Sequence, residues 1–327
     1  MPSAIVFDAP GGPEVLHWAP VDAATPGPDE VVIAVQAAGV NNADLMQRRG
    51  RYPLTPDAPV VLGMECSGTI TATGRDVTAW SVGDQVCALL DGGGYADEVV
   101  VRSSQVMPVP DGLTMTEAAA IPEVACTVYS NLAMIAGVAQ GKAVLIHGAG
   151  GGIGTFAVQW AAALGADVIT TAGSDEKTSA GMKLGARLAI NYRTEDFVSA
   201  CLAATNGRGV DVILDVVGSD YLARNIECLA PDGHLVVIGG STKPTLLDLS
   251  LLMSKRASVT ATMLRGRPAD QKAAIVAGVT RDVLPLFESG AIRVVVDSVV
   301  PLADAARAHR LLESTKTVGK VILANRR

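Results

Sequence analysis

The stretch AVLIHGAGGGIGTFAVQWAAALGA, residues 143–166, decides the fold of this chain. It sets a glycine-rich loop, GAGGGIG at 148–154, between an apolar run typical of a buried strand and an apolar run long enough for a helix. Backbone amides at a helix N-terminus can approach a pyrophosphate only where side chains are absent, so this order of elements is typical of a dinucleotide-binding turn. The strict GxGxxG spacing is not met, because the best register begins with Ala149 and continues with Gly151 and Gly154. An ordinary tight turn is the alternative, and the strands that follow disfavour it.

Strands and helices alternate from residue 142 onward, as a doubly wound parallel sheet requires. Each apolar run is bounded by turn residues and followed by a stretch suited to a helix. The runs predicted to form parallel strands are 142–147, 166–171, 187–191, 210–218, 233–240 and 258–264.

The first 110 or so residues have a different texture, with short alternating or β-branched runs cut by turn signals. They predict a compact β domain with strands within 4–10, 30–40, 60–74, 85–90 and 95–101. Thr114 and Glu117 then form a capping-box pattern at the start of an apolar helical segment, which Pro122 is predicted to break in two. Beyond residue 266 the tail does not fit a further strand–helix unit, and we expect it to return to the first domain.

Composition excludes several classes of protein. The 327 residues carry a formal net charge of -7 and no basic run, which disfavours a nucleic-acid partner. The five cysteines form no CxxC pair, so a zinc knuckle or redox dithiol is not indicated and a reduced, cytoplasmic setting is expected. The N-terminus lacks a signal-peptide pattern, and no uninterrupted apolar run reaches the roughly 18–20 residues of a membrane span. We therefore expect no membrane partner.

The turn after the second strand, TTAGSDEK at 170–177, indicates which dinucleotide binds. Ala172 stands where an NAD-preferring protein would carry the acid that binds the ribose 2′-hydroxyl. The hydroxyl of Ser174 and the cation of Lys177 suit a 2′-phosphate, so the hypothesis is that the cofactor is NADPH. Asp175 and Glu176 would oppose that phosphate if they point inward. Alternatively, Ser174 only caps a helix with two acids in its first turn.

The order of these motifs resembles the medium-chain dehydrogenase/reductase superfamily. The stretches NNADLMQRRGRYP at 41–53, GLTMTEAAAIPE at 112–123, TAGSDEKTSAGMKLGA at 171–186 and NYRTEDF at 191–197 resemble its NADPH:quinone oxidoreductase branch, of the tumour-suppressor-inducible and zeta-crystallin type. The resemblance implies an α/β fold, with a Rossmann-type doubly wound parallel sheet plus a GroES-like β-rich catalytic domain. It implies a GroES-like domain over 1–123 and 267–327 and a cofactor-binding domain over 124–266.

Zinc-dependent members of that superfamily carry a cysteine and a histidine where this chain has Asn41 and Met64. Neither residue can replace those ligands, and Cys87 stands alone where those members hold a structural zinc with four cysteines. The four histidines are scattered and show no ligand spacing with a cysteine. The resemblance therefore implies a zinc-independent enzyme with no metal ligands.

The resemblance places the nicotinamide near Asn41 and Tyr52, the predicted catalytic residues. Tyr52 could donate a proton or hydrogen bond to a developing oxyanion, or only stack against Pro53; Asn41 could orient a carbonyl, or only form a turn. Asp44 is predicted to cap the helix that follows, and Cys126 to be a buried filler. The residues predicted to bind the cofactor are Thr127, Gly150, Gly151, Gly152, Ile153, Gly173, Ser174, Lys177, Tyr192, Val217, Ile238, Gly239, Met263 and Leu264.

The implied function is NADPH-dependent reduction of quinones by direct hydride transfer, with a small-molecule quinone or other electrophilic carbonyl as substrate. An enone or enoyl-thioester reductase is the first alternative, because it shares the fold, the cofactor and the tyrosine. A non-catalytic NADPH-binding protein is the second. The resemblance also favours a homodimer, and the apolar run at 258–264 would suit pairing at a sheet edge.

Overall fold

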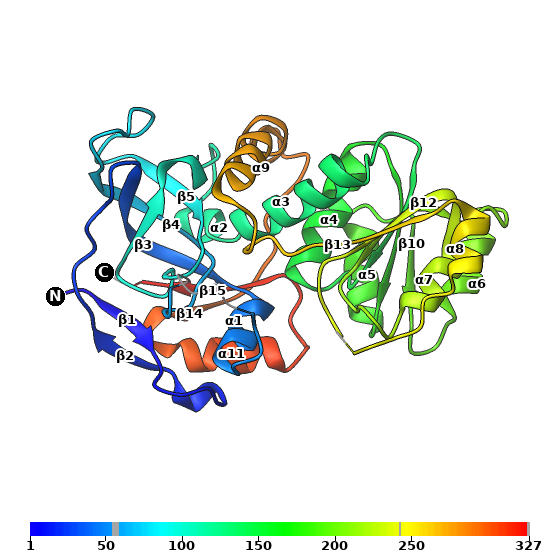
Figure 1. Ribbon diagram of the computed structural model, residues 1–327, viewed down its shortest axis with the longest axis horizontal. Coiled ribbons are helices and arrows are strands. Elements are labelled where there is room, and N and C mark those ends of the chain that lie inside the picture. The colour runs from blue at the N-terminus through cyan, green and yellow to red at the C-terminus, as the bar shows by residue number, and fades with distance from the viewer. Residues whose placement is uncertain (54–58, 242, 326–327) are drawn as a thin grey trace. The chain divides into compact units, whose positions relative to one another are not determined.

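The computed structural model describes residues 1–53, 59–241 and 243–325 (Figure 1). The chain divides into two compact units. Unit 1 comprises Met1–Cys126, Arg265–Gly290 and Val294–Arg327, and unit 2 comprises Thr127–Leu264 and Ala291–Arg293.

Unit 2 is built on a parallel sheet that contains, among the described residues, six strands in the order β10-β9-β8-β11-β12-β13. The order reverses between β8 and β11, and ligands of open parallel sheets bind at such a switch point, beyond the carboxyl ends of the strands. The six strand predictions are confirmed. The strands are β8 (Ala143–His147), β9 (Asp167–Ala172), β10 (Leu188–Asn191), β11 (Val210–Asp215), β12 (Leu229–Val237) and β13 (Ser258–Ala261).

Helices follow the strands of unit 2, as Figure 1 shows. Apolar side chains from the strands form its core together with Phe197, Cys201 and Cys228 of the helices. The helical elements are the π-helix Tyr129–Ile135, α4 (Gly152–Ala163), α5 (Asp175–Lys183), α6 (Phe197–Ala204), α7 (Leu222–Cys228) and α8 (Leu249–Lys255).

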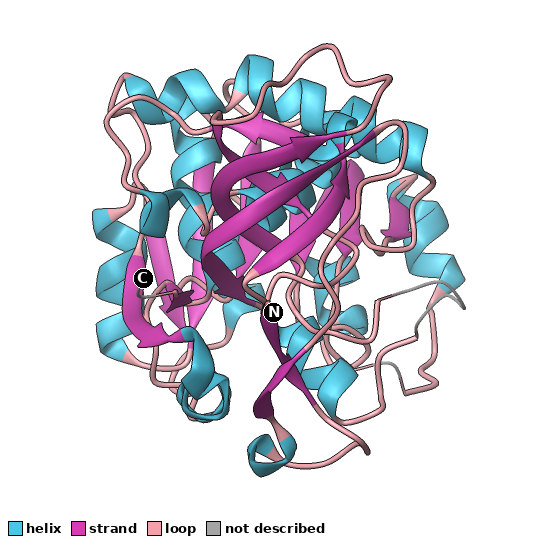
Figure 2. Cartoon of the chain, turned by 90° about the vertical axis from the view of Figure 1, so that its left-hand side faces the viewer, coloured by secondary structure: helices cyan, strands magenta, loops and turns pink. Residues whose placement is uncertain are grey.

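Unit 1 holds a bent, mostly antiparallel sheet (Figure 2). In the described residues seven strands belong to it, in the order β14-β15-β3-β4-β5-β7 with β6 paired to β3, and β1 and β2 form a separate hairpin. The C-terminal tail completes the sheet, because β15 pairs with the long strand β3. The strands are β1 (Ser3–Val6), β2 (His17–Pro20), β3 (Glu30–Val40), β4 (Glu65–Thr73), β5 (Gln85–Leu89), β6 (Glu98–Arg102), β7 (Val106–Pro108), β14 (Val296–Pro301) and β15 (Lys320–Ala324).

One helix of unit 1 begins at a cap that the sequence predicts. Thr114 and Glu117 form the predicted capping box, with the Thr114 amide donating to the Glu117 carboxylate at 2.9 Å. Pro122 is the first residue of the next helix, so the predicted break is confirmed. The helices are α1 (Asn42–Arg48), α2 (Met115–Ala118), α3 (Pro122–Val128, which reaches into unit 2), α9 (Ala269–Asp282), α10 (Leu284–Glu288) and α11 (Ala305–Glu313).

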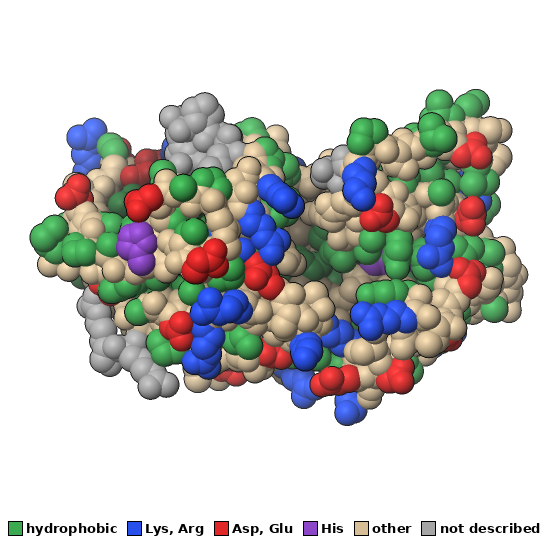
Figure 3. Space-filling view, turned by 90° about the horizontal axis from the view of Figure 1, so that it is seen from below, with side chains coloured by type: hydrophobic (Ala, Val, Ile, Leu, Met, Phe, Trp, Pro, Cys, Tyr) green, Lys and Arg blue, Asp and Glu red, His purple; other side chains and the backbone are tan. Residues whose placement is uncertain are grey.

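The described stretch Met115–Ile135, which includes α2, α3 and the π-helix, is long and apolar enough to cross a membrane, but 78% of its most apolar window is buried inside the protein. This is the burial expected of a core helix. On the face of the molecule drawn in Figure 3, positively and negatively charged side chains are interspersed.

Candidate functional site

The glycine loop leaves room for a ligand at the start of α4. Gly151 is the N-cap, and the amides of Gly152 and Ile153, in the first turn, have no acceptor inside the helix. Gly154 must be a glycine, because a Cβ there would lie 2.0 Å from the Gly148 carbonyl oxygen. A Cβ on Gly150 would lie 2.6 Å from Cδ of Lys177, so the lysine chain runs alongside the loop. These features fit the pyrophosphate of a dinucleotide.

The turn after β9 gathers the residues predicted to select NADPH. Ala172 is buried at the strand end, and the next position, Gly173, lies against Tyr192: a Cβ there would be 2.4 Å from the tyrosine hydroxyl oxygen. The Ser174 hydroxyl accepts a hydrogen bond of 3.4 Å from the Lys177 amide, so the capping role of Ser174 is confirmed. Capping does not use the lysine ammonium. The structure thus brings Gly173, Ser174, Lys177 and Tyr192 together.

The two acids of this turn are arranged differently. Asp175 accepts a hydrogen bond of 2.8 Å from the side-chain nitrogen Nδ2 of Asn191, and Glu176 is exposed. Sequence reasoning missed Arg193, whose Nε would lie 3.3 Å from a Cβ on Gly173. Its signal was its place directly after Tyr192. Two cationic residues, Lys177 and Arg193, therefore lie in or directly beside this turn.

A buried polar chain, here named the neutral network, supports the carboxyl ends of the parallel strands. It consists of Thr171, His147, Asn225 and Asp215. His147 Nδ1 lies 2.9 Å from the Thr171 hydroxyl, and Nε2 donates to Asn225 Oδ1 at 2.8 Å. Burial lowers the pKa of His147 to about 4, so the ring is neutral at pH 7. Asn225 Nδ2 then donates to Asp215 at 3.1 Å, and burial raises the pKa of that carboxyl.

The Asp215 carboxylate fixes the turn that carries Val217. It accepts from the amides of Val217 at 2.6 Å and Gly218 at 3.1 Å. The turn after β12 packs against it, because a Cβ on Gly240 would lie 2.2 Å from the Val217 carbonyl oxygen. Val217 and Gly239 are therefore close, as is Ile238, whose amide donates to the Asp215 carbonyl at 2.9 Å.

Thr127 is tied to the end of the last parallel strand. Asn131 Nδ2 donates to the Thr127 carbonyl at 2.8 Å, and Asn131 Oδ1 accepts from the Thr262 hydroxyl at 2.7 Å. Thr262 directly precedes Met263 and Leu264, so Asn131 connects these predicted cofactor residues to Thr127. No sequence signal pointed to Asn131, which lies within the π-helix, an element frequent at functional sites.

In unit 1, a buried cluster orients Asn41. We name Asn41, Glu65 and Lys320 the charged network. Lys320 Nζ lies 2.5 Å from Glu65 Oε1 and 2.7 Å from Asn41 Oδ1, and Asn41 Nδ2 donates to Glu65 Oε1 at 2.9 Å. Glu65 is fully buried and its second oxygen accepts from the Glu123 amide. The Asn41 side-chain oxygen is therefore occupied, and among the described residues the side-chain nitrogen Nδ2 donates only to Glu65.

Asp44 is confirmed as the helix-start residue and has a wider structural role. Its carboxylate accepts from the amides of Asn41 at 2.8 Å and Gly63 at 3.0 Å and from the Tyr95 hydroxyl at 3.1 Å. Burial raises its pKa to about 6, against the opposing effect of these donors. Asp44 joins the start of α1 to two loops of the sheet.

Tyr52 lies beside an arginine that the sequence did not indicate. The guanidinium carbon of Arg265 is 5.5 Å from the centroid of the Tyr52 ring. Burial raises the pKa of Tyr52 to about 12, although Arg265 opposes the rise. With such a pKa the phenol is a hydrogen-bond donor at pH 7 rather than an acid. Among the described residues its hydroxyl has no hydrogen-bond partner.

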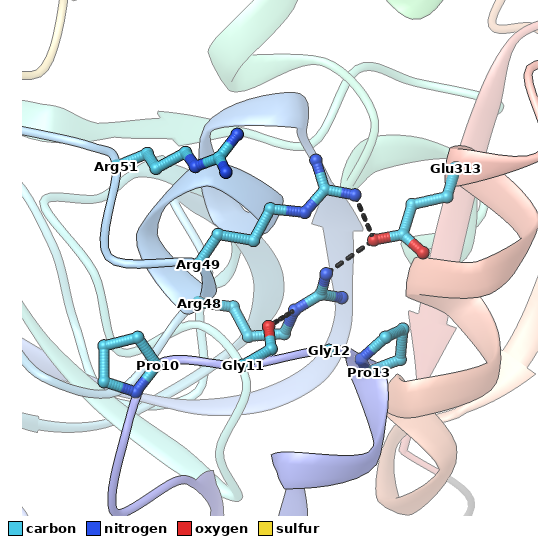
Figure 4. A pocket seen from close by; sticks show the side chains of 8 residues that line it. All are labelled: Pro10, Gly11, Gly12, Pro13, Arg48, Arg49, Arg51 and Glu313. Carbon is cyan, nitrogen blue, oxygen red and sulfur yellow. Dashed lines mark hydrogen bonds and ion pairs between the residues drawn. The ribbon is translucent and has the colours of Figure 1, made fainter.

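A pocket of about 550 Å³ opens at the far end of α1 (Figure 4). The Arg48 side chain is fully buried beneath it and binds the Gly11 carbonyl, His309 and Glu313, and Arg49 binds the same glutamate at 2.6 Å. Burial lowers the pKa of His309 to about 3, so it stays neutral beside the arginine. These contacts fasten α1 to α11, and α1 lies between its N-cap Asn41 and the loop that carries Tyr52. The lining residues are Pro10, Gly11, Gly12, Pro13, Arg48, Arg49, Arg51 and Glu313.

The five cysteines are free and buried. Burial raises the pKa of the Cys126 thiol well above its usual value, which suits a packing role and not that of a nucleophile. Within the described part of the chain, no group of three or more His, Cys, Asp or Glu side chains is placed to hold a metal.

Two family models match the chain: "Alcohol dehydrogenase GroES-like domain" over residues 27–111 and "Zinc-binding dehydrogenase" over 184–323. Among known proteins, a quinone oxidoreductase of Pseudomonas aeruginosa is 36% identical, with 99% of each chain covered. The chain belongs to the quinone oxidoreductase branch of the medium-chain dehydrogenases/reductases. Another relative is a 2-haloacrylate reductase of Burkholderia, 32% identical over 99% of each chain.

The quinone oxidoreductase fold extends over the whole chain. The structure of the Escherichia coli quinone oxidoreductase complexed with NADPH superimposes with a TM-score of 0.88, at 33% identity, covering 98% of this chain and 99% of that one. The predicted fold class, a parallel Rossmann-type sheet with a GroES-like domain, is confirmed. One matching family is named for zinc binding, whereas this chain has Asn41 and Met64 where the resemblance implies a cysteine and a histidine in zinc-dependent members.

Proposed function

We propose that the chain catalyses NADPH-dependent reduction of quinones by direct hydride transfer, without a metal. The observation that carries the proposal is the turn after β9. There Ala172 stands in place of the acid of NAD-binding proteins, Tyr192 and Arg193 lie against Gly173, and the Ser174 hydroxyl caps the helix that contains Lys177. The names of the relatives support it, since one is a quinone oxidoreductase and another was solved with NADPH. In this proposal residues 1–123 and 267–327 form the catalytic domain, and 124–266 the cofactor domain.

NADPH supplies a hydride when bound, and the chain's own residues bind and orient the reactants. The loop at 150–153 and the turn at 173–177 would hold the phosphates, and the segments ending at Thr127, Val217, Gly239 and Leu264 would hold the nicotinamide half. Asn41 would donate its remaining amide hydrogen to a carbonyl oxygen. Tyr52 would donate its hydroxyl hydrogen bond to the same end of the acceptor. Orientation and water exclusion then contribute most of the rate enhancement.

The relation to the Burkholderia 2-haloacrylate reductase favours a second candidate, reduction of an activated carbon–carbon double bond. The same donors would stabilise the enolate oxygen that such a reaction forms. We further propose a cytoplasmic homodimer. The buried free cysteines support the compartment, and exposed Leu249 and Met253 of α8 support a contact surface.

The deciding experiment measures oxidation of NADPH and, separately, NADH by the purified, chelator-treated protein. The acceptors are 9,10-phenanthrenequinone, 1,4-benzoquinone and 2-cyclohexenone. We expect rapid quinone reduction that prefers NADPH and survives the chelator. Activity confined to the enone would favour the second candidate, reduction of a carbon–carbon double bond. Activity lost on chelation would contradict the metal-free mechanism. NADPH binding without turnover on any acceptor would favour a non-catalytic role.

A further inference from the structure

Arg265 is a buried cation with unused hydrogen-bond donors. Its Nε and Nη2 are shielded from solvent, and neither has a hydrogen-bond partner among the described residues. A buried donor left unpaired is costly, and native structures rarely retain one without a reason. Both atoms lie on the same edge of the planar guanidinium, and such an edge matches one or two ligand oxygens.

The surroundings fix the direction of this edge. Nη1 donates to Gln47 Oε1 at 2.6 Å. The amide nitrogen of Gln47 is committed to the Pro59 and Val60 carbonyls at 3.3 and 3.2 Å, so the amide oxygen must face Arg265. On another side, Gly92 packs closely against the guanidinium, because a Cβ there would lie 3.1 Å from Nη2. The guanidinium is therefore pre-oriented beside the Tyr52 ring.

The nearby acids are engaged elsewhere, so Arg265 has no hydrogen-bonded carboxylate in the described structure. Asp44 is held by two amides and the Tyr95 hydroxyl, and Asp91 is paired with Lys272. Tyr52 is neutral at pH 7, as tyrosines ordinarily are, and burial raises its pKa further, to about 12. Burial lowers the pKa of Arg265, but an arginine remains protonated at pH 7. A pre-oriented cation of this kind attracts a negative oxygen.

We propose that Arg265 binds the acceptor's oxygen and stabilises the negative charge that forms there during reduction. This inference rests on the proposed function and deepens it. Hydride transfer to a quinone delivers one hydrogen nucleus and two electrons, leaving a hydroquinone monoanion whose charge lies on oxygen; a proton from solvent then completes the hydroquinone. Arg265 holds that oxyanion until it is protonated. Its place directly after Leu264, a predicted cofactor residue, and beside Tyr52 suits this role.

The kinetic test compares Arg265→Gln with wild type, using Arg267→Gln as a matched control. Arg267 lies two residues on and contacts Gln271 on the surface. Removing one oxyanion donor lowers kcat by roughly 100-fold, and we expect a loss of that order in Arg265→Gln. We expect a larger loss for the ortho-quinone, whose adjacent oxygens can use both N–H groups, and partial recovery in Arg265→Lys. Arg267→Gln should match wild type.

A binding test separates charge stabilisation from a structural role. The probes are 2-hydroxy-1,4-naphthoquinone, which is an oxyanion at neutral pH, and uncharged 1,4-naphthoquinone, each titrated into NADP⁺-loaded protein by calorimetry. We expect Arg265→Gln to weaken binding of the anionic probe at least tenfold and to change binding of the neutral quinone little. Equal losses for both probes, or a loss confined to NADPH affinity, would overturn the assignment. A wild-type protein that reduces no quinone would instead refute the proposed function, whatever the variant does.

Discussion

Each unit supports its candidate site residues with a buried hydrogen-bond network. The network of unit 1 contains an ion pair, whereas that of unit 2 consists mostly of uncharged side chains. In unit 1 the charged network pairs the ammonium of Lys320 with the carboxylate of Glu65 and uses both to orient Asn41. In unit 2 the neutral network runs through uncharged Thr171, His147 and Asn225 before it reaches Asp215. The first network presents a side-chain amide, whereas the second fixes a backbone turn.

This difference follows from the work proposed for each unit. Binding a dinucleotide requires backbone groups at fixed positions, and buried hydrogen bonds of mostly uncharged side chains can supply that rigidity. Stabilising charge on an acceptor oxygen requires donors and cations, and the proposals above assign this role to Asn41 and Arg265, both of unit 1. We expect the charged network to be the more sensitive to removal of one member, because an unpaired buried charge costs more than an unpaired neutral group.

We expect the largest effect from Lys320→Met, which tests whether the charged network is the more sensitive to removal of one member. The substitution leaves the Glu65 carboxylate fully buried without its cation, and we expect the free energy of unfolding to fall by about 3–5 kcal/mol. Urea unfolding followed by circular dichroism measures it. Exposed Lys316→Met is the matched control. Adding Glu65→Gln should recover part of the loss, and a Lys320→Met protein as stable as wild type would show that Glu65 does not depend on its partner.

Sequence reasoning found the position of Asn41 but not its network. The contact between Lys320 and Asn41 spans 279 residues, and that between Lys320 and Glu65 spans 255. No local pattern encodes such a pairing, because it depends on the tail strand β15 lying antiparallel to β3. Arg265 was missed for the same reason: its partner Gln47 is 218 residues away.

The neutral network predicts a pH dependence. The pKa of His147 is about 4 in the folded chain, below its ordinary value of 6.5. Between these pH values the unfolded chain binds a proton that the folded chain excludes, so stability falls as pH falls from 6.5 to 4, by up to about 3 kcal/mol. His147→Gln removes this titration. We therefore expect the variant to be less stable at pH 7 by about 1–3 kcal/mol, and the gap to narrow as pH falls.

Denaturant unfolding at several pH values between 7 and 4.5 measures that gap. His17→Gln is the control, since His17 is exposed. Asp44 titrates in the opposite sense, because its raised pKa of about 6 makes the folded chain the better proton binder at mildly acidic pH. That contribution is common to wild type and variant and cancels in the difference. A gap that stayed constant with pH would mean that His147 is not held neutral.

The residues predicted to bind the cofactor were easier to identify from the sequence than those proposed to contact the acceptor. The glycine loop, its flanking strand and helix and the turn at 173–177 are contiguous in the chain, so their residue types and spacing carry the geometry. Even there, Asn131 and Arg193 were missed, because their roles depend on Thr262 and Gly173, which lie in other segments of the chain. Local backbone motifs can be predicted; side chains that meet across the fold cannot.

The smallest expected effect concerns the turn that distinguishes NADPH from NADH. A charge-assisted hydrogen bond contributes about 1.5–3 kcal/mol, so Lys177→Ala should lower kcat/KM for NADPH at least about tenfold. The value for NADH should change little, because NADH lacks the 2′-phosphate. Lys183→Ala, an exposed lysine on the same helix α5, is the control. Asp175 is held by Asn191, so we expect its charge to weaken phosphate binding less than Lys177 strengthens it. An equal loss of kcat/KM for both cofactors would show that Lys177 supports the glycine loop it lies against and does not bind the 2′-phosphate.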